Sequence, residues 1–357
     1  MKASVRIRLR KLILVGVVLC ALMVGSLYAF FLANPVAFRA YAFQPVREIS
    51  FFIRELDALA SWSGIEKIVV PEPEMAVIPK QGFHGVDIVA GVYRPVTSGQ
   101  APAIVLQHGS YPWGRKAGLM RMLATRLAEN GFYVIVPDAR GFGDTADPVH
   151  VENPEAWRTA SDLTRVVDYL LASGDIDSGN IFVIGHSMGA NHTLEGGLAE
   201  SRVKALVLIG PGRYTNQQDV LVPEWIRARF SADRRLDQPV SSEVAIFAYS
   251  LGNLRLLAKS KLAEPDHKPV LLIDGEKEGE AKLVYLAEIV RTLEGPVEYH
   301  TLPGTGHYCG VRSFYGAETI YYRPEMFEPF FEIVLNFLER QGAPNGIPSE
   351  NDITLKP

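Results

Sequence analysis

Short apolar runs alternate with amphipathic segments along most of the chain, from about residue 84 to residue 341. Most of these runs are β-branched and continuously apolar, which is typical of strands covered on both faces of a parallel sheet. The first run instead alternates like a half-exposed strand. The predicted strands are VDIVAGVY (86–93), AIVLQ (103–107), YVIVP (133–137), IFVIG (181–185), ALVLIG (205–210), VLLID (270–274) and VEYHT (297–301).

Helical periodicity fills the intervals between these strands. A chain in which strands alternate with helices builds βαβ units with right-handed crossovers. The sequence therefore predicts an α/β fold around a doubly wound, mostly parallel sheet. The predicted helices cover residues 118–130, 154–173, 188–200, 281–294 and 324–342.

The alternation stops once, across residues 211–268, where helical stretches such as EVAIFAYSLGNLRLLAKSK occur without a strand. An unstructured loop of that length would be unusual inside a compact domain. We therefore expect a small helical insertion there. After the last predicted helix, residues 342–357 (GAPNGIPSENDITLKP) are expected to form a disordered tail.

The N-terminus predicts a membrane anchor. A basic flank, residues 1–11, precedes 22 uncharged residues, 12–33, which are long enough to cross a hydrocarbon core. The basic flank should stay in the cytoplasm, which places the rest of the chain outside it. A cleaved signal peptide, which would make the protein secreted, and a buried helix are the alternatives. Residues 34–83 are expected to form a juxtamembrane helix followed by an extended, proline-rich linker, VPEPEMAVIP.

Composition narrows the class of protein further. Hydrophobic residues make up 48% of the 357 residues and the net charge is −4, which fits a globular domain and gives no basic surface for nucleic acid. The two cysteines are Cys20, inside the apolar N-terminal run, and Cys309. Neither a disulfide framework nor a cysteine metal site is expected.

The sequence IFVIGHSMGAN centres the pattern Gly-x-Ser-x-Gly on Ser187, directly after a predicted strand and before a predicted helix. A nucleophilic serine needs this sharp, strained turn, with small residues at Gly185 and Gly189 where the backbone passes close. The start of the next helix favours the negative charge that develops nearby. A plain strand-to-helix turn is the alternative.

A serine hydroxyl becomes a good nucleophile only when a base removes its proton. Among the eight histidines, His307 in LPGTGHYCG is the best placed, because it follows the last predicted strand in a glycine-rich loop. His192 lies too far along the helix after the serine, and His186 is expected to pack within the turn. His307 is therefore the predicted base.

These motifs resemble those of the α/β-hydrolase family over roughly residues 84–341. The chain follows the family's order of nucleophile, acid and histidine. QHGSYPWG is similar to the family's oxyanion loop and VPDARGFGDT to its DxRGxG segment, while the insertion at 211–268 lies where family members carry a lid. The resemblance implies the α/β-hydrolase fold.

The resemblance also implies an oxyanion hole made by two backbone N–H groups. One belongs to Met188, directly after the nucleophile, and the other to Ser110, with Tyr111 as the fallback. Removing one such donor typically costs about 10²- to 10³-fold in rate. The alternative for His108 and Gly109 is that they only form a tight turn at the end of a strand.

In the resembling family the acid that orients the histidine commonly lies three residues after a glycine that ends a strand. In LLIDGEKEGE that glycine is Gly275 and the position is Glu278, where aspartate is usual but glutamate is tolerated. Asp274, at the strand end, is the rival. The acids left open besides these two are Glu276, Glu280 and Asp219. Carboxylates that are not used should face solvent and cap the helix that starts near Ala281.

The resemblance implies a serine hydrolase that cleaves small-molecule or lipid carboxylic esters through an acyl-enzyme, as an esterase or lipase does. Together with the predicted N-terminal anchor, it gives a membrane-anchored serine hydrolase. It calls for no metal or organic cofactor. A serine nucleophile argues against the epoxide hydrolase and haloalkane dehalogenase branches, which use aspartate. A peptidase, amidase or acyltransferase with the same triad, and a non-catalytic interaction protein with this fold, remain as alternatives.

Overall fold

The structure is a computed structural model. It describes residues 22, 24–26, 64–82, 85–96, 99–111, 113–157, 159–212, 227, 230, 240–249, 268–291, 296–313 and 319–342. Most of the predicted anchor, residues 12–33, and the predicted tail beyond Gly342 lie outside this set. Within the described ranges no helix is both long and apolar enough to span a bilayer.

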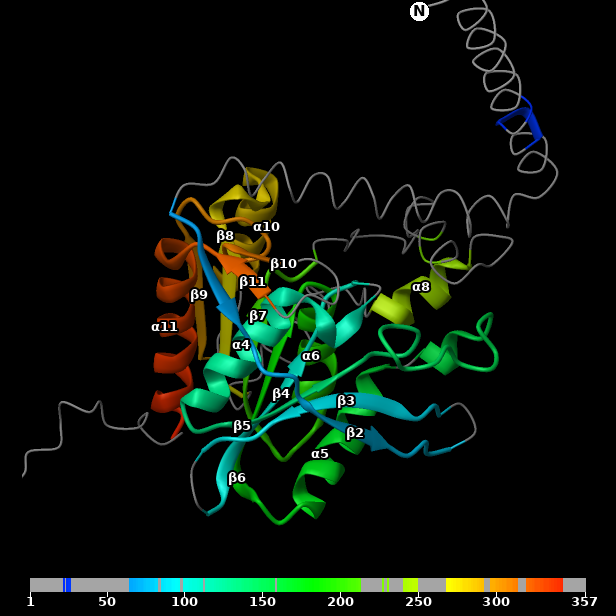
Figure 1. Ribbon diagram of the computed structural model, residues 1–357, viewed down its shortest axis with the longest axis horizontal. Helices are drawn as coiled ribbons and strands as arrows, with labels where there is room; N and C mark the ends of the chain where they lie inside the picture. Colours follow the sequence, from blue (N-terminus) through cyan, green and yellow to red (C-terminus); the bar gives the residue numbers. More distant parts are fainter. Residues whose placement is uncertain are drawn as a thin grey trace, which may run out of the picture.

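Eight strands form the central sheet in the order β2-β3-β5-β4-β6-β7-β8-β9 (Figure 1). The pairs from β5 through β4, β6, β7 and β8 to β9 are all parallel, whereas β3 pairs antiparallel with both β2 and β5. The prediction of a mostly parallel sheet is confirmed. The strands are β2 (Glu74–Ile78), β3 (Ile88–Tyr93), β4 (Ala101–Gln107), β5 (Tyr133–Pro137), β6 (Ile176–His186), β7 (Val203–Ile209), β8 (Val270–Gly275) and β9 (Val297–Leu302).

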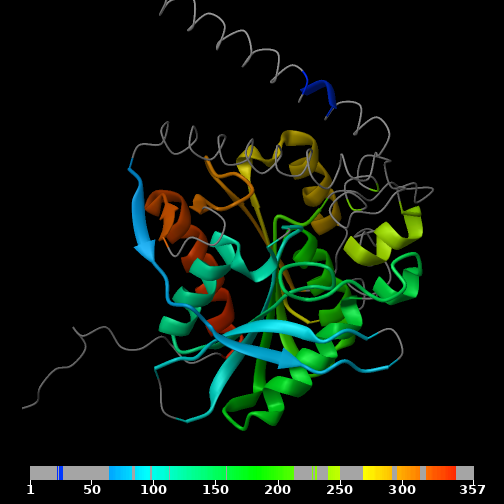
Figure 2. The same cartoon turned by 45° about the vertical axis from the view of Figure 1, so that its right-hand side comes forward.

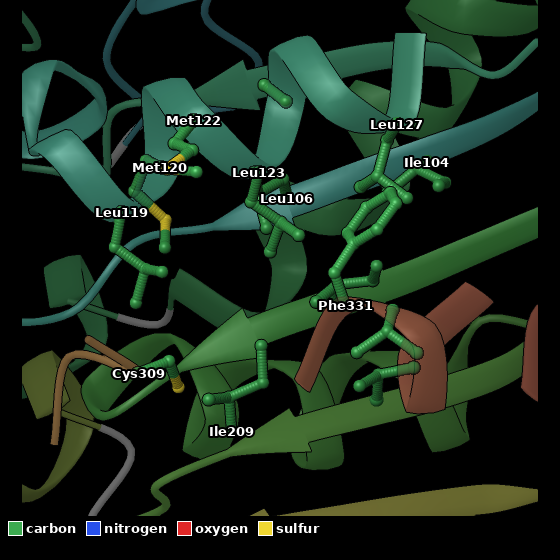
Figure 3. Close-up of a cluster of buried hydrophobic side chains, with 14 of the residues drawn as sticks. Ile104, Leu106, Leu119, Met120, Met122, Leu123, Leu127, Ile209, Cys309 and Phe331 are labelled. Carbon is green, nitrogen blue, oxygen red and sulfur yellow. The ribbon is translucent and has the colours of Figure 1, made fainter. Parts of the chain in front are cut away.

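Helices cover both faces of this sheet (Figures 1 and 2). On one face Ile104 and Leu106 of β4 pack with α4 and α11 (Figure 3), and on the other Ala103 and Val105 pack with α5, α6 and α10. Because successive side chains of a strand enter opposite layers, burial on both faces requires the continuous apolar runs seen in the sequence. The helices are α4 (Gly118–Glu129), α5 (Asp162–Ala172), α6 (Met188–Ala199), α10 (Glu280–Arg291) and α11 (Pro324–Arg340). Two 3₁₀ turns, η3 (Pro154–Trp157) and η4 (Thr159–Ser161), begin the segment that was predicted as one helix over 154–173.

The expected linker VPEPEMAVIP is the main correction to the predicted organisation. Its residues 74–78 form β2, the antiparallel edge strand of the sheet. Prolines flank this strand at 73 and 79, and proline is tolerated at such edges because the missing N–H faces away from the ladder. A second, three-stranded antiparallel sheet is also new, formed by β1 (Glu66–Val69), β10 (Val311–Ser313) and β11 (Thr319–Tyr322).

Part of the predicted insertion lies within the described residues. Helix α8 (Ser242–Tyr249) buries Val244, Ala245 and Ala248 in a cluster with Phe230 and Trp157. The Trp157 and Phe230 rings meet edge to face with centroids 4.8 Å apart. Met188, the first residue of α6, belongs to the same cluster. The described part of the insertion therefore packs over the start of α6, and the other residues of 211–268 lie outside the description.

A buried carboxylate holds the segments that precede α5. Asp162, at the first position of that helix, accepts two hydrogen bonds of 2.7 Å from Arg140 and one of 2.8 Å from Arg165. All three side chains are almost fully buried. Arg165 also donates to the carbonyls of Pro79 and Val86, so this cluster fastens the edge of the sheet to α5.

Replacing Asp162 with alanine should destabilise the fold strongly, because two arginines would stay buried without their carboxylate. We expect the free energy of unfolding to fall by about 3–5 kcal/mol in denaturant titrations. Asp168→Ala is the matched control, since that carboxylate pairs with Arg202 on the exposed side of the same helix. It should cost about 1 kcal/mol or less. Equal losses in the two variants would contradict this account.

Candidate active site

Ser187 lies on a strained turn between β6 and α6. Its φ of 57° and ψ of −117° are outside the regions that residues with a side chain ordinarily occupy. The Ser187 N–H donates to the Ile209 carbonyl at 2.8 Å, and the Ser187 carbonyl accepts from the Ala190 N–H in the first turn of α6. Such backbone strain persists only where the surroundings hold it, and it marks functional turns. The structure thus gives the Gly-x-Ser-x-Gly motif the geometry of a nucleophile elbow.

Two glycines allow the tight passage of the chain around this turn. A Cβ at Gly185 would lie 2.2 Å from the Gly189 carbonyl oxygen, and a Cβ at Gly189 would lie 2.3 Å from the Gln107 carbonyl oxygen. Both distances are far inside van der Waals contact, so any side chain would push α6 away from β4 and β6. The requirement for small residues at both positions is a matter of close backbone approach.

His307 faces the acid that the motif spacing favoured. Its Nδ1 donates a hydrogen bond to Oε1 of Glu278, a side chain that is only 12% exposed. This bond fixes the proton on Nδ1 and leaves Nε2 with a lone pair, which is the tautomer that a base needs. Burial alone would raise the pKa of Glu278, but the hydrogen bond and charge of His307, with the Lys282 ammonium, outweigh burial and lower that pKa. Glu278 is therefore an ionised partner of the imidazole.

Gly210 links this pair to the elbow. It directly follows Ile209, which accepts the Ser187 N–H, and it lies against the two side chains of the pair. A Cβ at Gly210 would be 3.2 Å from His307 Nδ1 and 3.4 Å from Glu278 Oε1. Ser187, His307 and Glu278 thus gather around the end of β7, at the carboxyl edge of the sheet.

The rival acid, Asp274, has a different partner. It is 1% exposed and accepts a hydrogen bond of 2.7 Å from Lys282 Nζ on α10. Burial is the main reason that its pKa rises to about 6, against the lowering effect of Lys282. The structure therefore brings Glu278 to His307 and turns Asp274 toward a lysine.

The remaining acids behave as expected only in part. Glu280 is exposed at the first position of α10, and Glu276 is exposed and accepts the Gly304 N–H at 2.7 Å. The expectation that every unused carboxylate faces solvent is wrong for Asp274, because that residue ends a buried strand. Asp219 lies outside the described residues.

The loop after β4 reaches the elbow from the other side. A Cβ at Gly109 would touch Ser187 Cβ at 3.1 Å, so the predicted oxyanion loop lies directly beside the serine. The Tyr111 N–H donates to the Gly109 carbonyl at 2.7 Å and is therefore engaged. Met188 begins α6, where the N–H groups of the first turn have no acceptor within the helix. This geometry favours Ser110 over Tyr111 as the second donor beside Met188.

His186 fastens these loops together, a role that the sequence did not reveal beyond packing. It is fully buried, its Nδ1 accepts from the Tyr111 hydroxyl at 2.6 Å, and its Nε2 donates to the His307 carbonyl at 2.7 Å. Its ring also stacks on Tyr111 with centroids 5.8 Å apart. Burial, followed by the charge of His307, lowers the pKa of His186 well below its usual value, so it stays neutral. The residue inside the motif thus ties the oxyanion loop to the loop of His307.

His108 is also neutral, and it shapes the oxyanion loop from within. Its Nε2 accepts the Ala139 N–H at 2.9 Å, so its Nδ1 carries the proton and donates to the Gly109 carbonyl. Burial is the main cause that lowers its pKa. Among the described residues, no group of three or more His, Cys, Asp or Glu side chains is arranged to hold a metal ion.

Two half-buried aromatic side chains flank the site. Trp113 stacks on Tyr111 with ring centroids 6.3 Å apart, and Tyr308 lies 5.9 Å from Tyr111 and 5.3 Å from His307. Next to them, Cys309 has a φ of 51° and is buried among the apolar side chains under α4 (Figure 3). Burial raises the pKa of its thiol. The two rings therefore border the site, whereas the thiol lies in the core.

Solved structures share this arrangement of sheet and helices. That of Est1E from Butyrivibrio proteoclasticus with ferulic acid bound is 16% identical, with a TM-score of 0.53 over 74% of this chain and 98% of the other. A soluble variant of monoglyceride lipase from Saccharomyces cerevisiae in complex with a substrate analogue is 16% identical, with a TM-score of 0.51 over 79% and 98%. The protein has the α/β-hydrolase fold.

Sequence comparisons match parts of this hydrolase fold. Residues 100–248 match the family model of the serine aminopeptidases, S33. The uncharacterized protein YcjY of Escherichia coli (strain K12) is 33% identical over 108 residues, which are 30% of this chain and 34% of the relative. Epoxide hydrolase A of Mycobacterium tuberculosis is 30% identical over 103 residues, 27% and 28% of the two chains. The chain thus spans about a third of the length of these curated relatives.

The hydrogen bonds of His186 predict that the Tyr111 hydroxyl contributes more to the free energy of unfolding than an exposed hydroxyl does. Tyr111→Phe would leave the buried Nδ1 of His186 without its donor, so we expect unfolding to become easier by about 1–3 kcal/mol. Tyr322→Phe deletes a hydroxyl that donates to the exposed Glu66, and it should cost less than about 1 kcal/mol. Chemical denaturation of both variants tests this. If Tyr111→Phe lost no more stability than Tyr322→Phe, the hydrogen bond between Tyr111 and His186 would contribute little to the fold.

Proposed function

We propose that the protein is a serine hydrolase that cleaves carboxylic esters through a covalent acyl-enzyme. The observation that carries the proposal is the gathering of three groups around the end of β7: Ser187 on its strained turn, His307, and Glu278 bonded to His307 Nδ1. A nucleophile, a base and an acid that orients the base form the set that activates a serine.

Acylation follows from these positions. Ser187 Oγ attacks the ester carbonyl carbon while His307 Nε2 takes the hydroxyl proton. Glu278 stays ionised and stabilises the imidazolium through Nδ1–H. The oxygen of the tetrahedral intermediate takes up negative charge, which the N–H groups of Met188 and Ser110 stabilise. The intermediate then collapses, the carbon–oxygen bond to the alcohol breaks, and the imidazolium returns its proton to the leaving alkoxide.

Deacylation repeats the same steps with water. His307 Nε2, now neutral again, removes a proton from a water molecule that attacks the acyl carbon. The same two N–H groups take the charge of the second tetrahedral intermediate. Its collapse releases the carboxylic acid and returns the proton to Ser187 Oγ, which restores the starting state. The reaction involves no change of oxidation state, and the triad is regenerated without a cofactor.

The surroundings favour an ester with an apolar or aromatic group. Trp113 and Tyr308 border the loops that carry Ser110 and His307, and the buried cluster of α8 reaches Met188. Est1E is described with ferulic acid bound and the monoglyceride lipase with a substrate analogue, and both descriptions are consistent with an ester substrate for this protein. The serine aminopeptidase match supports amide cleavage as the second candidate. The N-terminal membrane anchor, with the catalytic domain outside the cytoplasm, remains a prediction from the sequence, and such an anchor would bring lipophilic esters within reach.

Covalent labelling tests the nucleophile. A fluorophosphonate probe phosphonylates an activated serine, so it should label the full chain and fail to label Ser187→Ala. Thermal unfolding of the alanine variant checks that its fold is retained. Rates with p-nitrophenyl esters of rising acyl length and with amino-acid p-nitroanilides then separate ester from amide cleavage. Unlabelled but folded wild-type protein would end the proposal, as would labelling that survives in the alanine variant.

The two candidate acids should differ sharply in their effect on turnover. Glu278→Gln removes the charge that stabilises the His307 imidazolium, so kcat for a p-nitrophenyl ester should fall by about 10⁴-fold. Asp274→Asn leaves the bond between Glu278 and His307 in place and should lose far less. Steady-state kinetics on both variants decide the matter, and similar losses or the reverse order would refute the assignment.

A further inference from the structure

Three charged side chains meet behind His307 in a nearly dry part of the protein. Lys282, on the first turn of α10, lies 2.7 Å from Asp274 Oδ1 and 3.2 Å from Glu278 Oε2. The side chains of Lys282 and Asp274 are 6% and 0% exposed, and that of Glu278 is 12% exposed. One ammonium therefore bridges two carboxylates, of which only Glu278 contacts His307.

The two oxygens of Glu278 have separate partners. Oε1 accepts from His307 Nδ1 while Oε2 faces Lys282 Nζ. A carboxylate held at both oxygens cannot rotate without breaking a charged contact, so its orientation toward the imidazole is fixed. Asp274 holds the lysine from the end of β8, which is a rigid strand, whereas Glu278 lies on the short 3₁₀ turn η6 (Glu276–Glu278). Lys282 thus connects the η6 turn, which carries Glu278, to the end of strand β8.

The charge balance makes the lysine necessary. Two buried carboxylates that share a site cannot both stay ionised without a counter-charge, because each disfavours the charged form of the other. Lys282 supplies that counter-charge, and the cluster then carries one net negative charge to meet a protonated His307. The other titratable groups near the cluster are Tyr299 on β9, Cys309, Tyr111 and His186, all neutral at pH 7.

We propose that Lys282, anchored by Asp274, keeps Glu278 ionised and aimed at His307, and is thus a positioning residue of the site. This inference rests on the proposed hydrolase function. It gives Asp274 a role as well, since that residue holds the lysine and does not contact the histidine. The i,i+4 spacing from Glu278 to Lys282 lets both side chains reach each other across the start of α10.

The pH dependence of kcat/KM tests this role directly. Wild type, Lys282→Met, Asp274→Asn and the double variant are compared on a p-nitrophenyl ester between pH 5.5 and 9.5. In Lys282→Met the two carboxyls should hold one proton between them near neutral pH. The share of that proton on Glu278 weakens its support of the imidazolium, which moves the acid limb of the pH profile up by about 1–3 pH units. At pH 6.5 that shift lowers kcat/KM by about 10- to 10³-fold, with recovery toward pH 9. The double variant removes the repelling carboxylate, so its limb should return at least 1 unit toward wild type.

Thermal unfolding supplies a readout that does not need catalysis. A carboxyl whose pKa is raised in the folded state stabilises the fold at low pH, and that stability is lost as the pH rises through the raised pKa. The Tm of Lys282→Met should therefore lie several degrees below wild type at pH 8, with a gap that narrows by roughly 2 °C or more at pH 5.5. The double variant should show a gap that varies little with pH.

The outcomes separate the two proposals. Absence of Ser187-dependent hydrolysis in wild type overturns the proposed function, and with it the positioning role. An active wild type whose acid limb is unchanged in Lys282→Met overturns the role of the lysine alone. A double variant no better than Lys282→Met, together with a Tm gap independent of pH, shows that the lysine only fills space.

Discussion

The hydrogen bond from His307 Nδ1 to Glu278 joins two loops that leave neighbouring strands, and the site depends on their alignment. Strands β8 and β9 pair in parallel, with Asp274 opposite Thr301 and Gly275 opposite Leu302, so the loops start side by side. Backbone contacts continue the alignment, since the Lys277 N–H donates to the Thr305 carbonyl at 2.9 Å. A parallel sheet gathers the ends of distant segments at one edge, and here it gathers a serine, a histidine and an acid.

Asp274 and Glu278 differ in their electrostatic surroundings and therefore in their roles. Asp274, buried at the strand end, has a raised pKa and a lysine partner, whereas Glu278 has a lowered pKa and meets the imidazole. The longer glutamate side chain suits its position, because it reaches His307 from the η6 turn while its second oxygen faces Lys282. Burial has the opposite effect on the pKa of a histidine, and it keeps three histidines near the site neutral. His108, His186 and His192 are buried with lowered pKa values. The first two hold loops through hydrogen bonds, and His192 on α6 donates to the Ala248 carbonyl on α8.

The sequence predicted best what depends on local pattern. The strands from β3 to β8 lie where the apolar runs are, because burial on both faces requires apolar residues at successive positions. The short strands β1, β2, β10 and β11 were not predicted, since pairing with a neighbour, and not their own composition, defines them. Motif spacing pointed to Glu278, but it could not reveal that Asp274 is buried against Lys282. The i,i+4 spacing of Glu278 and Lys282 was a visible signal, yet only the fold shows that this pair lies behind His307.

The central claim is that Glu278, and not Asp274, holds the proton-bearing nitrogen of His307. A proton on an imidazole nitrogen that donates to a carboxylate in a buried hydrogen bond resonates far downfield of amide protons. One-dimensional ¹H NMR of the full chain, with the signal assigned by its loss in His307→Gln, measures this bond directly. We predict a downfield resonance in wild type that persists in Asp274→Asn and disappears in Glu278→Gln. A resonance that survives in Glu278→Gln and disappears in Asp274→Asn would contradict the account.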